Sequence, residues 1–168
     1  MPSIYSENSL YIEKALQHAF IAKLYQAIWQ TESRGLLEVS TTEIDDRGCD
    51  VVLSLGDVTR HVQFKSNHQG GRRGMADVNV GLGKKPSGCV VWYEYDPATL
   101  DIQKHYFFGG LPGEPLPDLT EFKVAKNSRA NADGVKTERH NVRSVPKSRF
   151  KAVESFEELV VLLFGELR

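Results

Sequence analysis

Apolar residues recur at helical spacing between about residues 10 and 30, which predicts a helix capped by Asn8 or Ser9. The sector that faces the core contains one carboxylate, Glu13, with Gln17 one turn further along. An unpaired carboxylate on such a face is costly, so Glu13 needs a cation, a hydrogen-bond partner or a cavity. A solvated helix start is the alternative to a functional role.

Short apolar runs separated by turn signals then predict a series of strands. These runs cover residues 36–44, 49–55, 60–66, 90–95 and 100–108. A basic, glycine-rich stretch between the third and fourth runs has a short helix or strand near residues 76–82, and a further strand is expected near residues 141–145. Ser155 and Glu158 form a capping box, which begins a helix that ends at Phe164. The order α-β-β-β-(α)-β-β-α predicts an α/β (α+β) domain with a mixed central sheet flanked by helices.

The stretch from Asp50 to Lys65 combines strand patterning with unusual polar positions. Gly56-Asp57 predicts a two-residue hairpin loop, so positions whose numbers sum to 113 pair with each other. Asp50 then lies opposite Gln63, and Lys65 follows Gln63 on the same face. A carboxylate, an amide oxygen and an ammonium converge on one patch, which suits a divalent metal and a phosphodiester.

Glu43 becomes a second candidate carboxylate if the connection before Asp50 is also a tight turn. A turn over residues 45–48 would pair positions whose numbers sum to 93, which sets Glu43 opposite Asp50. Glu43 is therefore another candidate ligand for the same patch, and an exposed edge charge is the alternative.

Composition limits the class of protein. A chain of 168 residues with 40% hydrophobic and 26% charged residues suits a single domain over residues 1–168. No apolar run approaches the roughly 20 residues that cross a bilayer, and the first residues lack the features of a signal peptide. We therefore expect a cytoplasmic protein without a membrane partner, with Cys49 and Cys89 as buried free thiols.

Charge is distributed unevenly along the chain. Residues 123–151 hold nine Lys or Arg and two acidic residues, a balance of +7, although the whole chain carries −1. This asymmetry predicts a negatively charged partner, and a solvated basic loop is the alternative. The candidate contacts to nucleic-acid phosphates come from this segment and from the glycine-rich stretch: Arg72, Arg73, Lys84, Lys85, Arg139, Arg143, Lys147 and Arg149.

The motif residues resemble those of a known nuclease superfamily. Gly48-Cys49-Asp50, then Gln63-Phe64-Lys65, behind the helix that carries Glu13, resemble the restriction endonuclease-like PD-(D/E)XK superfamily and its Gln-x-Lys (Mrr-like) branch. The likeness covers about residues 9–95. It implies a restriction endonuclease-like core and a metal-dependent nuclease that hydrolyses DNA, in restriction, defence or repair, with RNA the less favoured substrate. Cys49 stands in place of the proline of the motif, and Gln63 in place of its acidic residue.

The same resemblance implies roles for the catalytic candidates Asp50, Gln63, Lys65 and Glu13. Asp50 would be the central ligand of Mg²⁺ or Mn²⁺, beside Gln63 and the backbone carbonyl of Phe64, and Glu13 or Glu43 would complete the site. Lys65 would orient the attacking water. Because glutamine brings an oxygen but no charge, a catalytically inactive module that binds nucleic acid or a partner protein is the second hypothesis. The small size is compatible with a homodimer or with a subunit of a larger nuclease complex.

Overall fold

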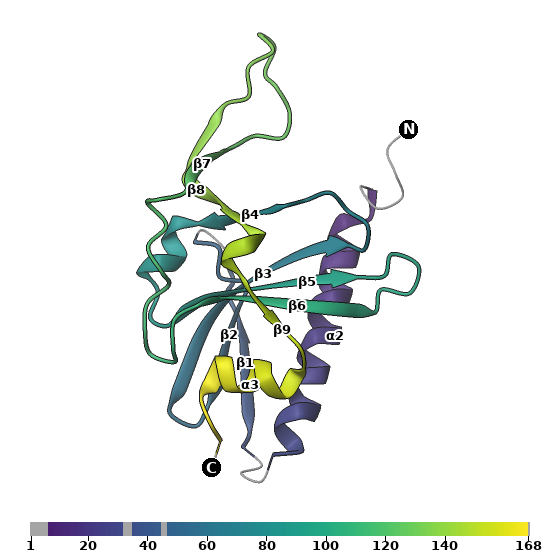
Figure 1. The fold of residues 1–168 in the computed structure, drawn as a ribbon, viewed down its shortest axis with the longest axis vertical. Coiled ribbons are helices and arrows are strands. Elements are labelled where there is room, and N and C mark those ends of the chain that lie inside the picture. The colour runs from purple at the N-terminus through teal and green to yellow at the C-terminus, as the bar shows by residue number, and fades with distance from the viewer. Residues whose placement is uncertain (1–6, 32–34, 45–46, 168) are drawn as a thin grey trace.

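The structure, a computed structural model, describes residues 7–31, 35–44 and 47–167 (Figure 1). It is a mixed α/β structure, which confirms the predicted class. Its elements in chain order are α2 (Ser9–Trp29), β1 (Leu37–Thr41), β2 (Val51–Leu55), β3 (Val58–His68), β4 (Met75–Asn79), η1 (Val80–Lys84), β5 (Gly88–Tyr95), β6 (Ile102–Gly109), β7 (Lys123–Lys126), β8 (Glu138–Pro146), η2 (Lys147–Arg149), β9 (Lys151–Val153) and α3 (Phe156–Phe164).

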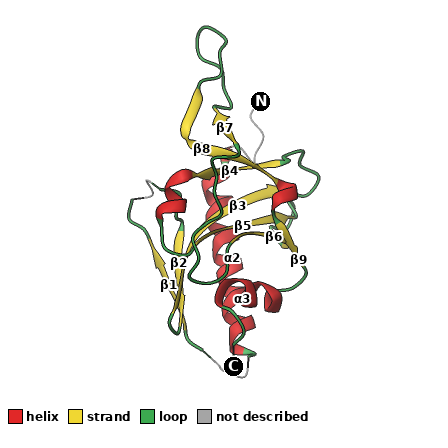
Figure 2. Cartoon of the chain, turned by 60° about the vertical axis from the view of Figure 1, so that its left-hand side comes forward, coloured by secondary structure: helices red, strands yellow, loops and turns green. Residues whose placement is uncertain are grey.

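The main sheet has six strands in the order β1-β2-β3-β5-β6-β9. Only β3 and β5 are parallel, so the sheet is mixed, as predicted. A second, three-stranded antiparallel sheet has the order β4-β8-β7 (Figure 2). The predicted element order lacks this sheet, because β4 and β8 are far apart in the sequence and their pairing leaves no local pattern.

Two hydrophobic cores lie on the two faces of the main sheet. On one face, α2 and α3 pack against alternate strand residues, with Phe20, Leu159 and Val51 fully buried. On the other face, the intervening strand residues, such as Val90 and Trp92, pack against β4, η1 and β8. The prediction of flanking helices is therefore correct for one face, whereas the small sheet covers the other. None of the helices described here is long and apolar enough to cross a membrane.

The predicted register of the β2–β3 hairpin is confirmed. Val51 pairs with Val62 and Leu55 with Val58, so paired numbers sum to 113. Gly56 has a φ of +58°, which a tight loop of this kind requires.

The predicted register of β1 against β2 is wrong by one residue. Leu37 pairs with Leu55, a sum of 92 instead of 93, and a shift of one turns every side chain to the other face of the sheet. The cause is a longer connection: β1 ends at Thr41 and β2 begins at Val51, with Thr42 Oγ1 donating to the Cys49 carbonyl at 2.9 Å. Residues 45 and 46 of the predicted turn lie outside the described residues.

Several further local predictions hold, but the side-chain cap predicted for the first helix does not: Asn8 is at the N-cap position of α2 and makes no side-chain capping hydrogen bond. The element near residues 76–82 is strand β4 followed by the short 3₁₀ helix η1, and the strand near residues 141–145 is part of β8. Ser155 Oγ accepts a hydrogen bond from the Glu158 amide at 3.1 Å, so the capping box begins α3 as predicted. Both cysteines are buried thiols, and neither is in a disulfide among the described residues.

Candidate functional site

The candidate site lies where β3 extends beyond its neighbour β2. β2 accompanies β3 only from Val58 to Val62, whereas β5 accompanies it from His61 to His68. In the described part of the chain, no strand pairs with the β2 side of β3 after Val62. A cavity of about 320 Å³ opens there, lined by Glu13, Gln17, Asp50, Gln63, Phe64, Lys65, Ser66, Arg73 and Tyr93.

Asp50 is held in the gap by its own backbone and by its side chain. Its amide donates to the Val62 carbonyl at 2.9 Å, and its Oδ2 accepts from the Phe64 amide at 2.5 Å. The partners in these two hydrogen bonds, Val62 and Phe64, precede and follow Gln63, so the Asp50 carboxylate lies beside Gln63. Because the N–H and C=O of one residue point to the same side of a strand, the Phe64 carbonyl also points toward this gap.

Gln63 lines the cavity and has an amide side chain that is almost fully buried. The residue is only 6% exposed, and its Oε1 is buried without a hydrogen-bond partner among the described residues. A buried polar atom left unsatisfied costs about 1–3 kcal/mol. An amide oxygen is a suitable ligand for a hard cation, so this orphaned atom fits a bound divalent metal.

Glu13 reaches the cavity from the start of α2. It lies three and seven residues before Leu16 and Phe20, which are fully buried, so it is on the same helix face. Near the helix start this face opens into the cavity, and Glu13 is exposed there. The cavity is one of the environments expected from the sequence for a carboxylate on this helix face.

Lys65 brings a cation into the same volume. Burial of the ammonium lowers the pKa of Lys65 below its usual value of 10.5. The negative charges of Asp50 and Asp77 oppose this shift, while Arg73 and Arg139 add to it. Lys65 therefore faces both signs of charge, from the main sheet and from the small one.

Tyr93 on β5 responds to the two carboxylates of the cavity. Burial raises the pKa of its phenol, and the negative charges of Asp50 and Glu13 raise it further. Glu13 and Asp50, which are far apart in the sequence, therefore act on one site.

The ligand set suits magnesium better than zinc. No group of three or more His, Cys, Asp or Glu that could hold a metal exists within the described ranges. The cavity offers two carboxylates, the Gln63 amide and the Phe64 carbonyl. Mg²⁺ is commonly held by one or two carboxylates and keeps several waters, whereas structural zinc needs four nitrogen or sulfur ligands. Glu43 is exposed and does not line the cavity.

The predicted phosphate contacts in the glycine-rich stretch lie at different distances from this site. Arg73 lines the cavity itself. Arg72 and Lys84 are exposed, and Lys85 is half-buried at the end of η1.

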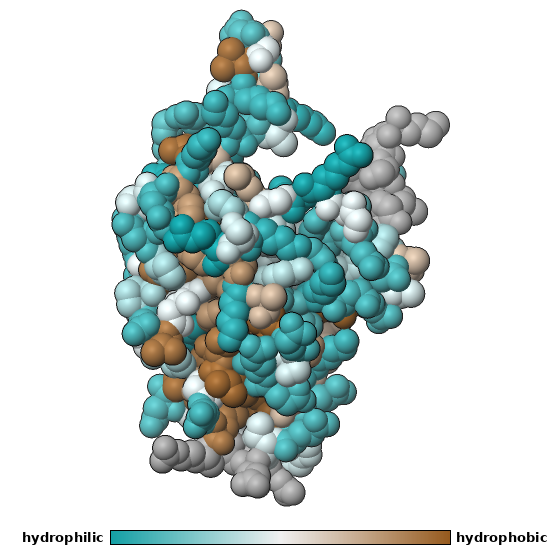
Figure 3. Space-filling view, in the orientation of Figure 1, coloured by the Kyte–Doolittle hydropathy of each residue, from teal (hydrophilic) through white to brown (hydrophobic). Residues whose placement is uncertain are grey.

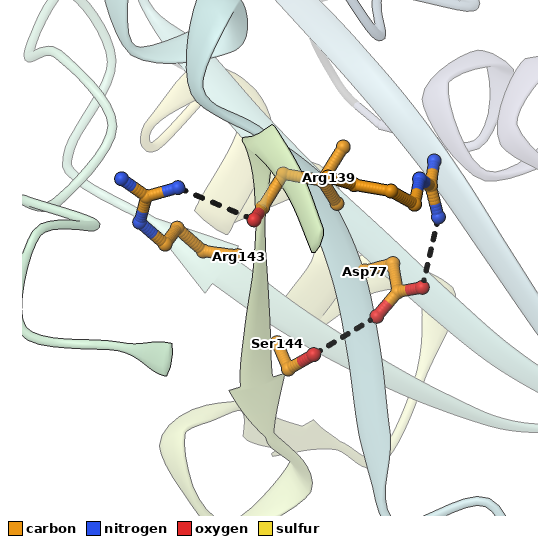
Figure 4. Close-up of polar contacts among 5 residues, drawn as sticks. Asp77, Arg139, Arg143 and Ser144 are labelled. Carbon is orange, nitrogen blue, oxygen red and sulfur yellow. Dashed lines mark hydrogen bonds and ion pairs between the residues drawn. The ribbon is translucent and has the colours of Figure 1, made fainter. Parts of the chain in front are cut away.

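The predicted contacts in the C-terminal basic segment already have partners. Lys147 pairs with Glu94 and lies 4.2 Å from the centre of the Tyr106 ring, and Arg149 pairs with Glu121 at 2.7 Å. Arg143 donates to the His140 carbonyl at 2.7 Å (Figure 4).

Asp77 on β4 is a residue that the sequence analysis missed. Arg139 pairs with its Oδ2 at 3.2 Å, and Ser144 Oγ donates to its Oδ1 at 3.1 Å (Figure 4). Its charge also acts on Lys65. The only local signal is the alternation of buried Ala76, half-buried Asp77 and buried Val78, which indicates a strand without indicating what Asp77 faces.

The outer part of the β7–β8 hairpin, residues 126–141, projects from the molecule, and we call it the arm. It rises at the end of the molecule where α2 begins (Figures 1 and 2). The space-filling view shows it standing clear of the body and covered mainly by hydrophilic residues (Figure 3). All residues from 126 to 141 are exposed, and their basic members are Lys126, Arg129, Lys136 and Arg139.

Comparisons with protein-family models, with curated proteins and with solved structures find no match for this chain.

Proposed function

We propose that this protein is a metal-dependent nuclease that hydrolyses DNA phosphodiester bonds and has a core like that of the PD-(D/E)XK nucleases. One observation carries the proposal: Asp50, Gln63 and Lys65 line one cavity beside the open edge of β3, and the Gln63 oxygen has no hydrogen-bond partner among the described residues.

In this proposal, Asp50, Gln63, the Phe64 carbonyl and Glu13 hold Mg²⁺ or Mn²⁺. The metal, when bound, polarises the phosphodiester and lowers the pKa of a bound water. Lys65 orients the attacking water and stabilises the negative charge that develops on the phosphate. Arg73, which also lines the cavity, binds a neighbouring phosphate.

The decisive experiment is nicking of supercoiled plasmid with Mg²⁺, Mn²⁺ or EDTA, beside single-stranded DNA and RNA substrates. We expect metal-dependent cleavage that falls at least about a hundredfold in Asp50→Asn and Lys65→Ala, because each removes a charge that acts on the reacting phosphate. Lys104→Ala is the control, since Lys104 is exposed and lies outside the cavity. Cleavage that survives EDTA, or that Asp50→Asn retains, would contradict the proposal.

The second candidate is an inactive nuclease-fold module that binds nucleic acid or a partner protein. The uncharged Gln63 at the acidic position of the motif favours it. Gln63→Glu distinguishes the two candidates, because an added carboxylate should create cleavage in an inactive module and only modify it in an active nuclease. Salt-sensitive DNA binding without cleavage by any metal would support the module.

A further inference from the structure

Helix α2 is apolar on two opposite faces. One face packs into the core through Leu16, Phe20 and Leu24, which are fully buried. The opposite face carries a line of aromatic and small residues spaced alternately by four and three positions, which we call the outer stripe: Tyr11, Ala15, His18, Ala22, Tyr25 and Trp29. This spacing keeps residues on one side of a helix and is the spacing of a coiled-coil seam.

Three aromatic side chains of the outer stripe are substantially exposed. Tyr11 is 72% exposed, Tyr25 45% and Trp29 62%. Single exposed aromatics are ordinary on a protein surface, but a continuous apolar line marks an interaction site.

We propose that the outer stripe is the interface of a homodimer, in which the α2 helices of two copies pack antiparallel across a two-fold axis. Side-chain size argues for a second copy in this orientation. When paired numbers sum to 40, Tyr25 lies opposite Ala15, and His18 lies opposite Ala22. Large residues then fill the space above small ones, whereas parallel helices would set alanine against alanine and tyrosine against tyrosine.

The two-fold symmetry also fits the stripe itself. In an isologous interface the same patch serves both copies, so each contact occurs twice. The antiparallel register makes each half of the stripe the complement of the other half, with Tyr11 opposite Trp29 at both ends.

The exposed aromatics supply most of the area at which specific dimers begin. An aromatic side chain buries about 150–250 Å², so the three aromatics at their exposed fractions offer about 350 Å² per copy. With His18, the alanines and flanking side chains, the two copies together approach about 1,000 Å², where specific interfaces begin.

The chemistry of the stripe disfavours the other occupants. It contains no Lys or Arg, which nucleic acid would require. The stripe lies opposite the helix face that carries Glu13, so pairing leaves the cavity open. The dimer does not depend on the proposed nuclease activity.

Sedimentation equilibrium of the full chain over a wide concentration range tests the interface. Ala22→Glu puts a charge at the centre of the stripe, and we expect the dimer dissociation constant to rise at least about a hundredfold. Lys23→Glu is the matched control, because it puts the same residue at an exposed neighbouring position off the stripe and should remain dimeric. Tyr25→Lys is a second variant, with circular dichroism confirming that each protein is folded.

A wild-type chain that is monomeric at all concentrations would overturn the proposal. So would a dimer that survives both stripe variants, because its interface would lie elsewhere. Cysteine cross-linking tests the orientation: Ala15→Cys protomers should cross-link to Tyr25→Cys protomers in a mixture, and Ala15→Cys alone should not. Efficient self-cross-linking of Ala15→Cys would overturn the antiparallel arrangement.

Discussion

At the scale of single residues, Gly48 positions the metal-binding candidate Gln63. Gly48 has a φ of +71°, and a Cβ there would lie 2.5 Å from Gln63 Nε2 and 2.6 Å from the Asn79 Cβ. We expect Gly48→Ala to displace the Gln63 amide, to lower the free energy of unfolding by about 2–4 kcal/mol and to weaken Mn²⁺ binding. Urea denaturation and a Mn²⁺ titration measure the two effects.

Gly56→Ala is the control for backbone conformation. Gly56 has a similar φ of +58°, but a Cβ there would meet no atom within 4 Å. Gly56→Ala should lower the free energy of unfolding by only about 1 kcal/mol and leave Mn²⁺ binding unchanged. Equal losses in the two variants would mean that the contact with Gln63 is unimportant.

His105 on β6 should make stability depend on pH. Burial, aided by the charge of Lys23, lowers the pKa of His105 from 6.5 to about 4. Between these pH values the unfolded chain binds a proton that the folded chain does not, so stability falls as the pH drops from 6.5 toward 4. The loss is at most about 3 kcal/mol, and urea denaturation at several pH values measures it.

His105→Phe isolates this contribution. His105 packs against Phe20 and Phe156, and its buried Nε2 has no partner among the described residues, so a phenyl ring suits the position. The variant should lose less stability between pH 6.5 and 4 than the wild type does. The same pH dependence in both proteins would place the titrating group elsewhere.

At the scale of elements, the arm should contribute to DNA binding through its exposed cations. Arg129 and Lys136 lie in the tip, beyond the pair at which the Asn127 amide donates to the Thr137 carbonyl at 2.9 Å. Replacing both cations with serine should weaken DNA binding and reduce the slope of log K against log salt by about 1–2. Fluorescence anisotropy in EDTA measures binding without cleavage.

Lys23→Ser with Lys104→Ser is the matched control. It removes the same charge from exposed positions that line a different cavity, beside β6 and β9. If both double variants weaken binding equally, the arm has no special role and only net charge matters.

Local patterns predicted the elements whose geometry is set within a few residues. Gly56-Asp57 determines the β2–β3 register, because a two-residue loop leaves one way to pair the strands, and this register brings Asp50 beside Gln63. The predicted β1–β2 register was wrong because the long connection between these two strands does not restrict their pairing in this way.

Contacts between distant segments were beyond local patterns. The Asp77–Arg139 pair joins β4 to β8, and neither strand indicates the other in the sequence. The sequence predicted this region as a basic segment with one strand. It did not indicate β7, because the pairing of β7 with β8 closes a hairpin with a long tip. Charge composition showed that this segment is basic, but not that it projects from the body of the molecule.

At the scale of the whole molecule, the main sheet is shared by two cores, and each core contains one cysteine. Cys89 belongs to the core under α2 and α3, and Cys49 to the core under the small sheet. Burial raises the pKa of Cys89 to about 11, so its thiolate is scarce at neutral pH while the protein is folded.

The rate at which each thiol reacts therefore reports how often the layer that buries it opens. If the chain is one cooperative domain, both should react with an alkylating reagent at a single rate that follows global unfolding. Mass spectrometry after timed labelling in dilute urea reads the two positions separately. Faster labelling of Cys49 would show that the small sheet detaches first, and that the layer carrying the arm can open while the helical layer remains closed.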